Sequence, residues 1–199
     1  MRNSITVSSI EKAVDELNNG GVVVIPTDTV YGLACRVDDS EAIEQIYKIK
    51  SREKAKQLPI LAADVESVER YGASISDEER KLMQKFWPGP LTIVLKVHGG
   101  TEAFRIPESE MALDVIRGAG GLLRVTSANV SGKPPAATAV EARLAVGGMV
   151  KVIVDSGEPL EGVPSTVMKV GDGRTEEQVI VFREGALSRQ ELEQAIDEE

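Results

Sequence analysis

The densest set of side chains that could do chemistry lies in residues 127–135, with the sequence SANVSGKPP. Two serine hydroxyls, an asparagine amide, a glycine and a lysine in one short stretch suit a ligand rich in oxygen atoms. The apolar run over residues 122–126 predicts a buried strand directly before it, so the stretch should lie at the carboxyl end of a strand, where open α/β sheets bind ligands. The alternative is an ordinary Ser/Asn/Gly loop that satisfies its own turn.

A basic segment over residues 50–56, KSREKAK, places four cations at the end of a helix predicted over residues 41–50. Cations in a last turn complement the helix dipole, so a solvated, stabilising face is the usual explanation. This acidic chain has few such clusters, however, and the sequence returns to the sheet just afterwards. Lys50, Arg52 and Lys56 could therefore project over the sheet edge and hold a polyphosphate, with arginine as a planar fork and lysine as a point charge.

Hydroxyl and guanidinium groups also follow several predicted strands. Residues 26–33, PTDTVYGL, come after a buried strand and could bind a small polar substrate through Thr27 and Thr29, unless these hydroxyls only satisfy the turn. Residues 86–92, FWPGPLT, indicate a rigid turn whose aromatic pair caps the core rather than stacks a base. The remaining candidates lie near strand ends and are Thr101, Arg105, Ser165 and Arg183.

Composition argues against several functional classes. A formal net charge of −9 makes the chain a poor candidate for binding nucleic acid over a broad basic surface, because such binding depends on neutralised phosphates. The sequence has one histidine and one cysteine. Metal sites built on several histidines, and Ser-His-Asp or Cys-His catalytic systems, are therefore poor candidates, because each needs an imidazole as a ligand or base. The P-loop and Rossmann glycine patterns are also absent, so a bound nucleotide would need side-chain cations and loop N–H groups.

The same composition predicts a single domain over residues 1–199, in the cytoplasm. The sequence has no apolar run of membrane-spanning length and no secretory signal, so no membrane partner is expected. Cys35 is the single cysteine and cannot form an internal disulfide.

Helical and strand patterns interleave along the chain. The Ser8-x-x-Glu11 spacing predicts a helix that begins with a capping box and ends before two glycines, and three further boxes begin at Ser76, Thr138 and Ser188. Strands are predicted over residues 22–25, 58–62, 91–97, 103–106, 122–126, 151–154, 166–170 and 179–183. This alternation predicts an α/β fold (α+β in some classifications), an open twisted sheet with flanking helices.

The ordered set of motifs resembles the YrdC-like family of threonylcarbamoyl-AMP synthases. The motifs are PTxTVYGL from residue 26, KxR from residue 50, FWPGPLT from residue 86, RxP from residue 105 and SANxSGKP from residue 127. Each motif is weak alone, but the set in this order is specific and, with an arginine and a glycine near residue 185, spans almost the whole chain. The resemblance implies a YrdC/DHBP-synthase-like fold, in which an open twisted sheet surrounds a concave, positively charged cavity.

The resemblance also implies an activity. Members of the family join L-threonine, bicarbonate or CO2 and ATP, with Mg²⁺, into threonylcarbamoyl-AMP and pyrophosphate. A separate transferase then modifies tRNA, so hand-off to such a partner and little direct tRNA binding are expected. The chemistry needs no protein nucleophile, because the amine of threonine forms a carbamate that attacks the α-phosphorus; positioning and charge neutralisation should do most of the catalysis.

Site residues carry over from the family by motif. The resemblance implies catalytic roles for Lys50 and Arg52, which would offset charge on the leaving group. It implies ATP contacts at Lys50, Arg52, Lys56, Thr101, Ser127, Asn129 and Arg183. It implies threonine contacts at Thr29, Arg105, Val125 and Ser165. No side-chain metal ligand is implied, and Asp28 is either a general base or a cap of its turn.

Three departures from the family pattern concern individual ATP contacts, and they are Glu53, Pro135 and Glu184. Longer members also carry a histidine after the basic motif and a C-terminal domain that these residues do not include. Two alternative functions stay open. One is an RNA-binding or ribosome-maturation module of the same fold, and the other is an ATP-binding homologue that uses another acceptor.

Overall fold

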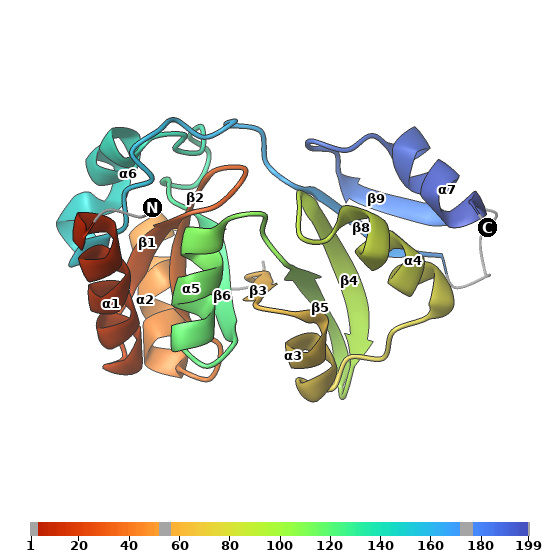
Figure 1. The fold of residues 1–199 in the computed structure, drawn as a ribbon, viewed down its shortest axis with the longest axis horizontal. Helices are drawn as coiled ribbons and strands as arrows, with labels where there is room; N and C mark the ends of the chain where they lie inside the picture. The colour runs from red at the N-terminus through yellow and green to blue at the C-terminus, as the bar shows by residue number, and fades with distance from the viewer. Residues whose placement is uncertain (1–3, 52–56, 172–176, 199) are drawn as a thin grey trace.

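The computed structural model describes residues 4–51, 57–171 and 177–198. In these residues, nine strands form one mixed sheet in the order β7-β1-β2-β6-β3-β5-β4-β8-β9 (Figure 1). The strands are β1 Val23–Pro26, β2 Tyr31–Arg36, β3 Ile60–Ala62, β4 Leu91–Val97, β5 Gly100–Arg105, β6 Leu122–Ser127, β7 Val152–Ile153, β8 Thr166–Val170 and β9 Val179–Arg183. The helices are α1 Ser4–Asn18, α2 Ser40–Lys50, α3 Val65–Arg70, α4 Asp77–Phe86, α5 Glu110–Gly118, α6 Ala139–Val146 and α7 Arg189–Asp197, with a 3₁₀ turn at Gly147–Met149. The predicted α/β class is confirmed.

Helices cover the two ends of the sheet unequally. At β1 and β2, residues from α1 and α5 pack on one face and residues from α2 and α6 on the other. At the β5-β4-β8-β9 end, α3, α4 and α7 pack together on a single face, over residues such as Phe104, Ile93 and Met168. Figure 1 shows the same division into two groups of helices. As far as the described residues go, the second end of the sheet therefore has no helical layer on its other face, and this face is available for a binding site.

The three residues of β3 join the two ends of the sheet. Ile60 pairs with Arg124 of β6 on one side and with Phe104 of β5 on the other. On the helix-covered face of this junction, Arg124 forms a partly buried ion pair with Glu102, at 2.6 Å. The same guanidinium donates to the carbonyl of Leu58, which fixes the residues that lead into β3.

Local capping explains most of the helix boundaries. The three capping boxes at Ser76, Thr138 and Ser188 are all present and begin α4, α6 and α7, as predicted. The prediction for the first helix is wrong in one respect, because α1 begins at Ser4 and passes through Ser8. A Ser-x-x-Glu spacing makes a cap only where the first residue has extended backbone, and the residues before Ser8 are already helical.

Three elements were not predicted from the sequence. Strand β2 is buried on both faces, so it shows no alternation of apolar and polar residues. Helices α3 and α5 begin at Asp64 and Ser109, whose side chains accept a hydrogen bond from the third residue of the helix. Neither has the reciprocal Glu or Gln of a full capping box, which is the signal that identified α4, α6 and α7.

We predict that Cys35 is unreactive in the folded protein. Burial, with the charge of Asp39 second, raises the pKa of its thiol from 9.0 to about 12. At pH 8 the thiolate is therefore scarce, and iodoacetamide should label the native chain only as fast as the chain unfolds. Because the folded-state pKa is the higher one, this thiol contributes stability below pH 9 that is lost as the pH rises toward 12. Rapid labelling of folded protein at pH 8, measured by mass spectrometry, would contradict this prediction.

Candidate active site

A cavity of about 430 Å³ lies on the face of the sheet that has no helical layer. Thr92, Ala103, Arg105 and Val167 contribute to it from β4, β5 and β8. The other lining residues are Thr27, Thr29, Val30, Gly32, Gln57, Pro59, Leu61, Val125, Thr126, Ser127, Asn129, Lys133, Pro135, Pro164, Ser165 and Arg183. The cavity thus collects strand ends and turns that are far apart in the sequence.

Lys50 connects the end of α2 to the turn after β6. Its side chain is 2% exposed, and its ammonium donates to the carbonyl oxygens of Ser127, at 2.5 Å, and Asn129, at 2.8 Å. It also donates to Oδ1 of Asn129 at 3.0 Å. The ammonium also lies 3.5 Å from Ser127 Oγ, so its contacts concentrate on the turn after β6. In this structure Lys50 therefore holds the turn, and the phosphate contact expected of it stays a prediction.

Asn129 is also committed to the turn. Its amide nitrogen donates to the carbonyl oxygens of Val130, at 3.1 Å, and Lys133, at 2.6 Å. Gly132 has a φ of +83°, a conformation that favours glycine, and it reverses the chain between these acceptors. With its Oδ1 bound by Lys50, the Asn129 side chain shapes the loop, while Ser127 and Lys133 face the cavity beside it. Both interpretations of this stretch are thus partly correct, since it satisfies its own turn and lines a cavity.

The turn between β1 and β2 holds two threonine hydroxyls close together. Thr27 Oγ1 donates to the carbonyl of Val30 at 2.7 Å and accepts from the N–H groups of Thr29 and Val30. The two threonine hydroxyl oxygens lie 3.0 Å apart, and either could be the donor. Thr29 Oγ1 also accepts from Arg105, so this turn and the guanidinium form one buried polar group.

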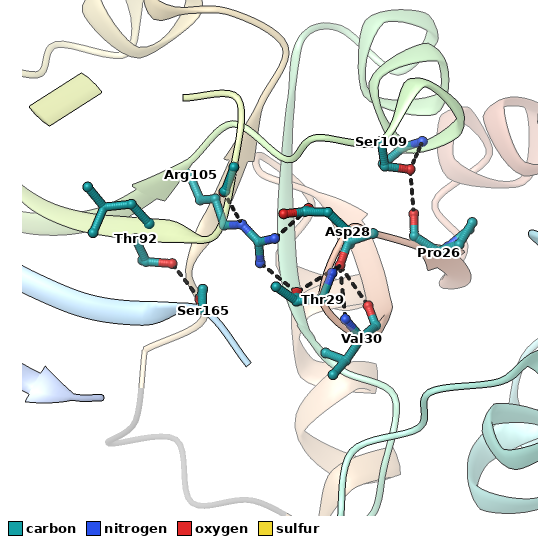
Figure 2. Close-up of polar contacts among 12 residues, drawn as sticks. Pro26, Asp28, Thr29, Val30, Thr92, Arg105, Ser109 and Ser165 are labelled. Atoms are coloured by element: carbon teal, nitrogen blue, oxygen red, sulfur yellow. Dashed lines mark hydrogen bonds and ion pairs between the residues drawn. The ribbon is translucent and has the colours of Figure 1, made fainter. Parts of the chain in front are cut away.

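Arg105 lies at the centre of the polar groups in Figure 2. Its guanidinium donates to the carbonyl of Gly89 at 2.9 Å, to Thr29 Oγ1 at 2.9 Å and to Asp28 Oδ1 at 2.5 Å. The Arg105 side chain is 6% exposed; burial lowers the pKa of the guanidinium, and the Asp28 carboxylate opposes this shift. Three of five N–H groups have partners among the described residues, so two stay available to an anion.

A shift in the register between β8 and β9 directs the side chain of Arg183 toward the cavity. Val167 pairs with Arg183 and Met168 with Val181, so β9 carries one extra residue, Phe182, at this point. Cross-strand partners share a face, and the shift therefore places Arg183 on the cavity face with Val167. Strict alternation from Val181 would have turned it toward the helices. Arg183 donates to the carbonyl oxygen of Ser165 at 2.8 Å and to Ser165 Oγ at 3.2 Å.

Hydroxyl, amide and cationic groups make up the polar part of the cavity, and none of the described residues that line it is acidic. Within the described ranges, no cluster of three His, Cys, Asp or Glu side chains could hold a metal ion. Across the same part of the chain, no helix has both the length and the apolar composition that a membrane crossing requires. The arrangement suits an anionic ligand with hydrogen-bonding groups of its own.

Comparison with known proteins identifies the family. The family model Sua5_yciO_yrdC, described as "Telomere recombination", matches residues 15–185. The chain belongs to this family. A threonylcarbamoyl-AMP synthase of Pyrococcus abyssi is 35% identical over 208 residues, which cover all of this chain and 60% of that protein. A putative threonylcarbamoyl-AMP synthase of Methanocaldococcus jannaschii is 34% identical, and the match covers 89% of this chain and 86% of that protein.

A solved structure agrees with the sequence comparison. The crystal structure of Pyrococcus abyssi Sua5 complexed with L-threonine superposes with a TM-score of 0.87 at 33% identity. The superposition covers 94% of this chain and 57% of that protein. This chain therefore spans less than two thirds of the Pyrococcus relative.

Most residues singled out by the resemblance to the YrdC-like family meet in one place. Thr29, Arg105, Val125, Ser127, Asn129, Ser165 and Arg183 all line the cavity. Thr101 does not; it is exposed near the start of β5, on the same face as Ala103 but farther out. Arg52 and Lys56 lie outside the described residues, and the contacts expected of them stay predictions.

Sequence reasoning did not single out Thr92 or Gln57 as site residues, although both line the cavity. A signal for Thr92 was available, because it alternates with Leu91 and Ile93, which are both buried in the core on the other face. Its hydroxyl had to face away from the helices. No comparable signal exists for Gln57, which lies outside any strand or helix.

Proposed function

We propose that the protein is an L-threonylcarbamoyladenylate synthase, a nucleotidyltransferase that acts in tRNA modification. The observation that carries the proposal is the convergence of Thr29, Arg105, Ser165 and Arg183 with Ser127 on one cavity. These are residues that the family resemblance assigns to threonine and ATP. Curated relatives carry the same activity in their names, and the Pyrococcus relative has been crystallised with L-threonine.

The hydrogen-bonding state of the cavity supports a site for an amino acid. The two available N–H groups of Arg105 can bind a carboxylate in a charge-assisted pair. The hydroxyl oxygen of Thr29 lies 2.9 Å from an N–H nitrogen of Arg105 and has a second lone pair that can accept an amine or ammonium hydrogen. We place the carboxylate of L-threonine at Arg105 and its amine near Thr29, with Val125 and Ser165 completing this part of the site.

ATP is proposed to occupy the part of the cavity near the turn after β6. Ser127 and Lys133 face this region, and Arg183 approaches it from β9. In the described part of the chain, the N–H groups of Val130 and Gly132 have no hydrogen-bond partner, so they can bind phosphate oxygens. Arg52 and Lys56 would add their cationic charge, and Mg²⁺ would be carried by the phosphates, where it would help to neutralise the leaving group.

The chain's own groups would act by position and charge. Threonine held at Arg105 would present its amine to CO2, from bicarbonate or directly, and the resulting carbamate would attack the α-phosphorus as pyrophosphate leaves. Cationic side chains at the phosphates would offset the developing charge, without a covalent protein intermediate. The product would pass to a tRNA threonylcarbamoyl transferase in the cytoplasm, and little direct contact with tRNA is proposed because of the net charge of −9.

The test is to incubate the purified protein with ATP, Mg²⁺, bicarbonate and each amino acid in turn, and to identify adenylates by mass spectrometry. We expect threonylcarbamoyl-AMP and pyrophosphate, both dependent on L-threonine. An adenylate formed with another acceptor would identify the ATP-binding homologue instead. Absence of any adenylate, together with salt-sensitive binding of tRNA, would favour the RNA-binding alternative.

A further inference from the structure

Two buried hydroxyls in the cavity wall form a pair with an incomplete set of hydrogen bonds. Thr92 is 2% exposed and Ser165 is 6% exposed, and their hydroxyl oxygens lie 2.8 Å apart. Ser165 Oγ also accepts from the guanidinium of Arg183 at 3.2 Å. Two hydroxyls carry two protons, but a single proton lies between them. Within the described residues, the second proton has no acceptor.

This unpaired donor faces the cavity, which both residues line. Leaving a buried donor unsatisfied is unfavourable, so the site favours a ligand group that accepts a hydrogen bond at this position. Whichever hydroxyl donates to the other, the pair still offers one proton and at least one lone pair. A ligand hydroxyl, which both donates and accepts, matches this combination, whereas a carboxylate or phosphate can only accept.

The pair also lies at a suitable distance from the proposed carboxylate site. Ile93 pairs with Phe104 in the β4–β5 register, so Thr92 and Arg105 are neighbours on adjacent strands and on the same face. Directly opposed residues have Cβ atoms about 5 Å apart. Figure 2 shows the Thr92–Ser165 pair on one side of Arg105, with Asp28 and Thr29 on the other. A ligand with its carboxylate on Arg105 can therefore reach the pair with a hydroxyl on its β-carbon.

We propose that Thr92 is a specificity-determining residue, which acts with Ser165 as one unit to recognise the side-chain hydroxyl of a β-hydroxy amino acid. The inference rests on the proposed function, because it concerns the same amino-acid site. It adds a residue that neither the resemblance nor the charge pattern assigned, and it explains how L-threonine would be distinguished from L-valine. L-valine has nearly the same shape but offers no hydrogen bond to the pair.

The experiment compares binding of L-threonine and L-valine by calorimetry, in the presence of ATP, for wild type, T92V, T92S and S165A. We expect T92V to reduce the preference for threonine over valine by about thirtyfold, the effect of losing one buried hydrogen bond of about 2 kcal/mol. T92S keeps the hydroxyl and should retain the preference. The double variant T92V/S165A should lose little more than the larger single effect, because the two residues act as a unit.

Thr166→Val is the matched control. Thr166 is fully buried next to Ser165, but its hydroxyl is satisfied within the protein by Leu187 and Gly185. We expect T166V to lower the melting temperature without changing the threonine-to-valine preference. If T92V binds threonine with an unchanged preference, or wild type shows no preference, the inference is overturned. Wild type that prefers threonine but forms no adenylate would overturn the proposed function and leave this inference in place.

Discussion

Replacing Arg105 by methionine is expected to lower kcat/KM for L-threonine about a hundredfold or more, the effect of removing one charge-assisted contact to a carboxylate. The same change should destabilise the fold by about 3–5 kcal/mol, because it leaves the carboxylate of Asp28, which is 14% exposed, without its ion-pair partner. Steady-state kinetics and thermal unfolding measure the two effects separately. Similar catalytic losses for every amino acid tested would still fit a carboxylate contact, since all of them carry that group.

The double variant Arg105→Met/Asp28→Asn separates the effect of Arg105 on stability from its effect on activity. Removing the charge at Asp28 as well should restore much of the lost stability, because no unpaired charge is then buried. It should not restore activity, since the donors of the guanidinium are still absent. A double variant that regains both stability and activity would show that Arg105 serves only the fold. This outcome would remove the carboxylate site from the proposal.

Lys50→Met is expected to have the largest effect on the loop after β6, which lines the side of the cavity proposed for ATP. The change leaves the two carbonyl oxygens and the amide oxygen of residues 127–129 without their charged donor. We expect a loss of about 3 kcal/mol in unfolding free energy. A chain of this length shifts by about 2–4 °C for each kcal/mol, so the melting temperature should fall by about 6–12 °C. Activity should fall even at temperatures where the variant is fully folded.

Lys48→Met is the matched control for Lys50→Met, because Lys48 lies on the same helix but is exposed. It should change neither the melting temperature nor the affinity for an ATP analogue by a measurable amount. If Lys50→Met behaves like Lys48→Met in both measurements, the buried ammonium does not organise the turn. If Lys50→Met keeps its stability and loses ATP affinity alone, Lys50 contacts phosphate directly, as the sequence had suggested.

The fold could be predicted well where its signals are local. Capping boxes mark α4, α6 and α7, because the reciprocal hydrogen bonds join residues three apart in the sequence. Strands β4, β8 and β9 coincide with their predicted ranges. The order of strands in the sheet could not be read in the same way, since β3 pairs with β6 and β5, which are 40 or more residues away along the chain.

The sequence predicted which residues line the cavity better than it predicted the hydrogen bonds that these residues make. The motifs named Ser127, Arg105 and Arg183, and all three line the cavity. They did not reveal that Lys50 turns inward, because its acceptors are 77 and 79 residues away along the chain. The direction of Arg183 depends on an extra residue in β9, and strict alternation along the strand gives the opposite direction. The contacts of Lys50 and the direction of Arg183 depend on how distant segments pair, which the pattern of residues along the sequence does not specify.

The short central strand β3 limits how the cavity can open. The backbone of β3 is hydrogen-bonded to both β5 and β6. The two ends of the sheet therefore cannot rotate apart without breaking these backbone hydrogen bonds. The proposed amino-acid and nucleotide subsites would therefore keep a fixed separation, because Arg105 and Ser127 lie on the two strands that flank β3. Any widening of the cavity would therefore come from its peripheral loops, so turnover should respond to loop rigidity more than to rotation of the two ends of the sheet.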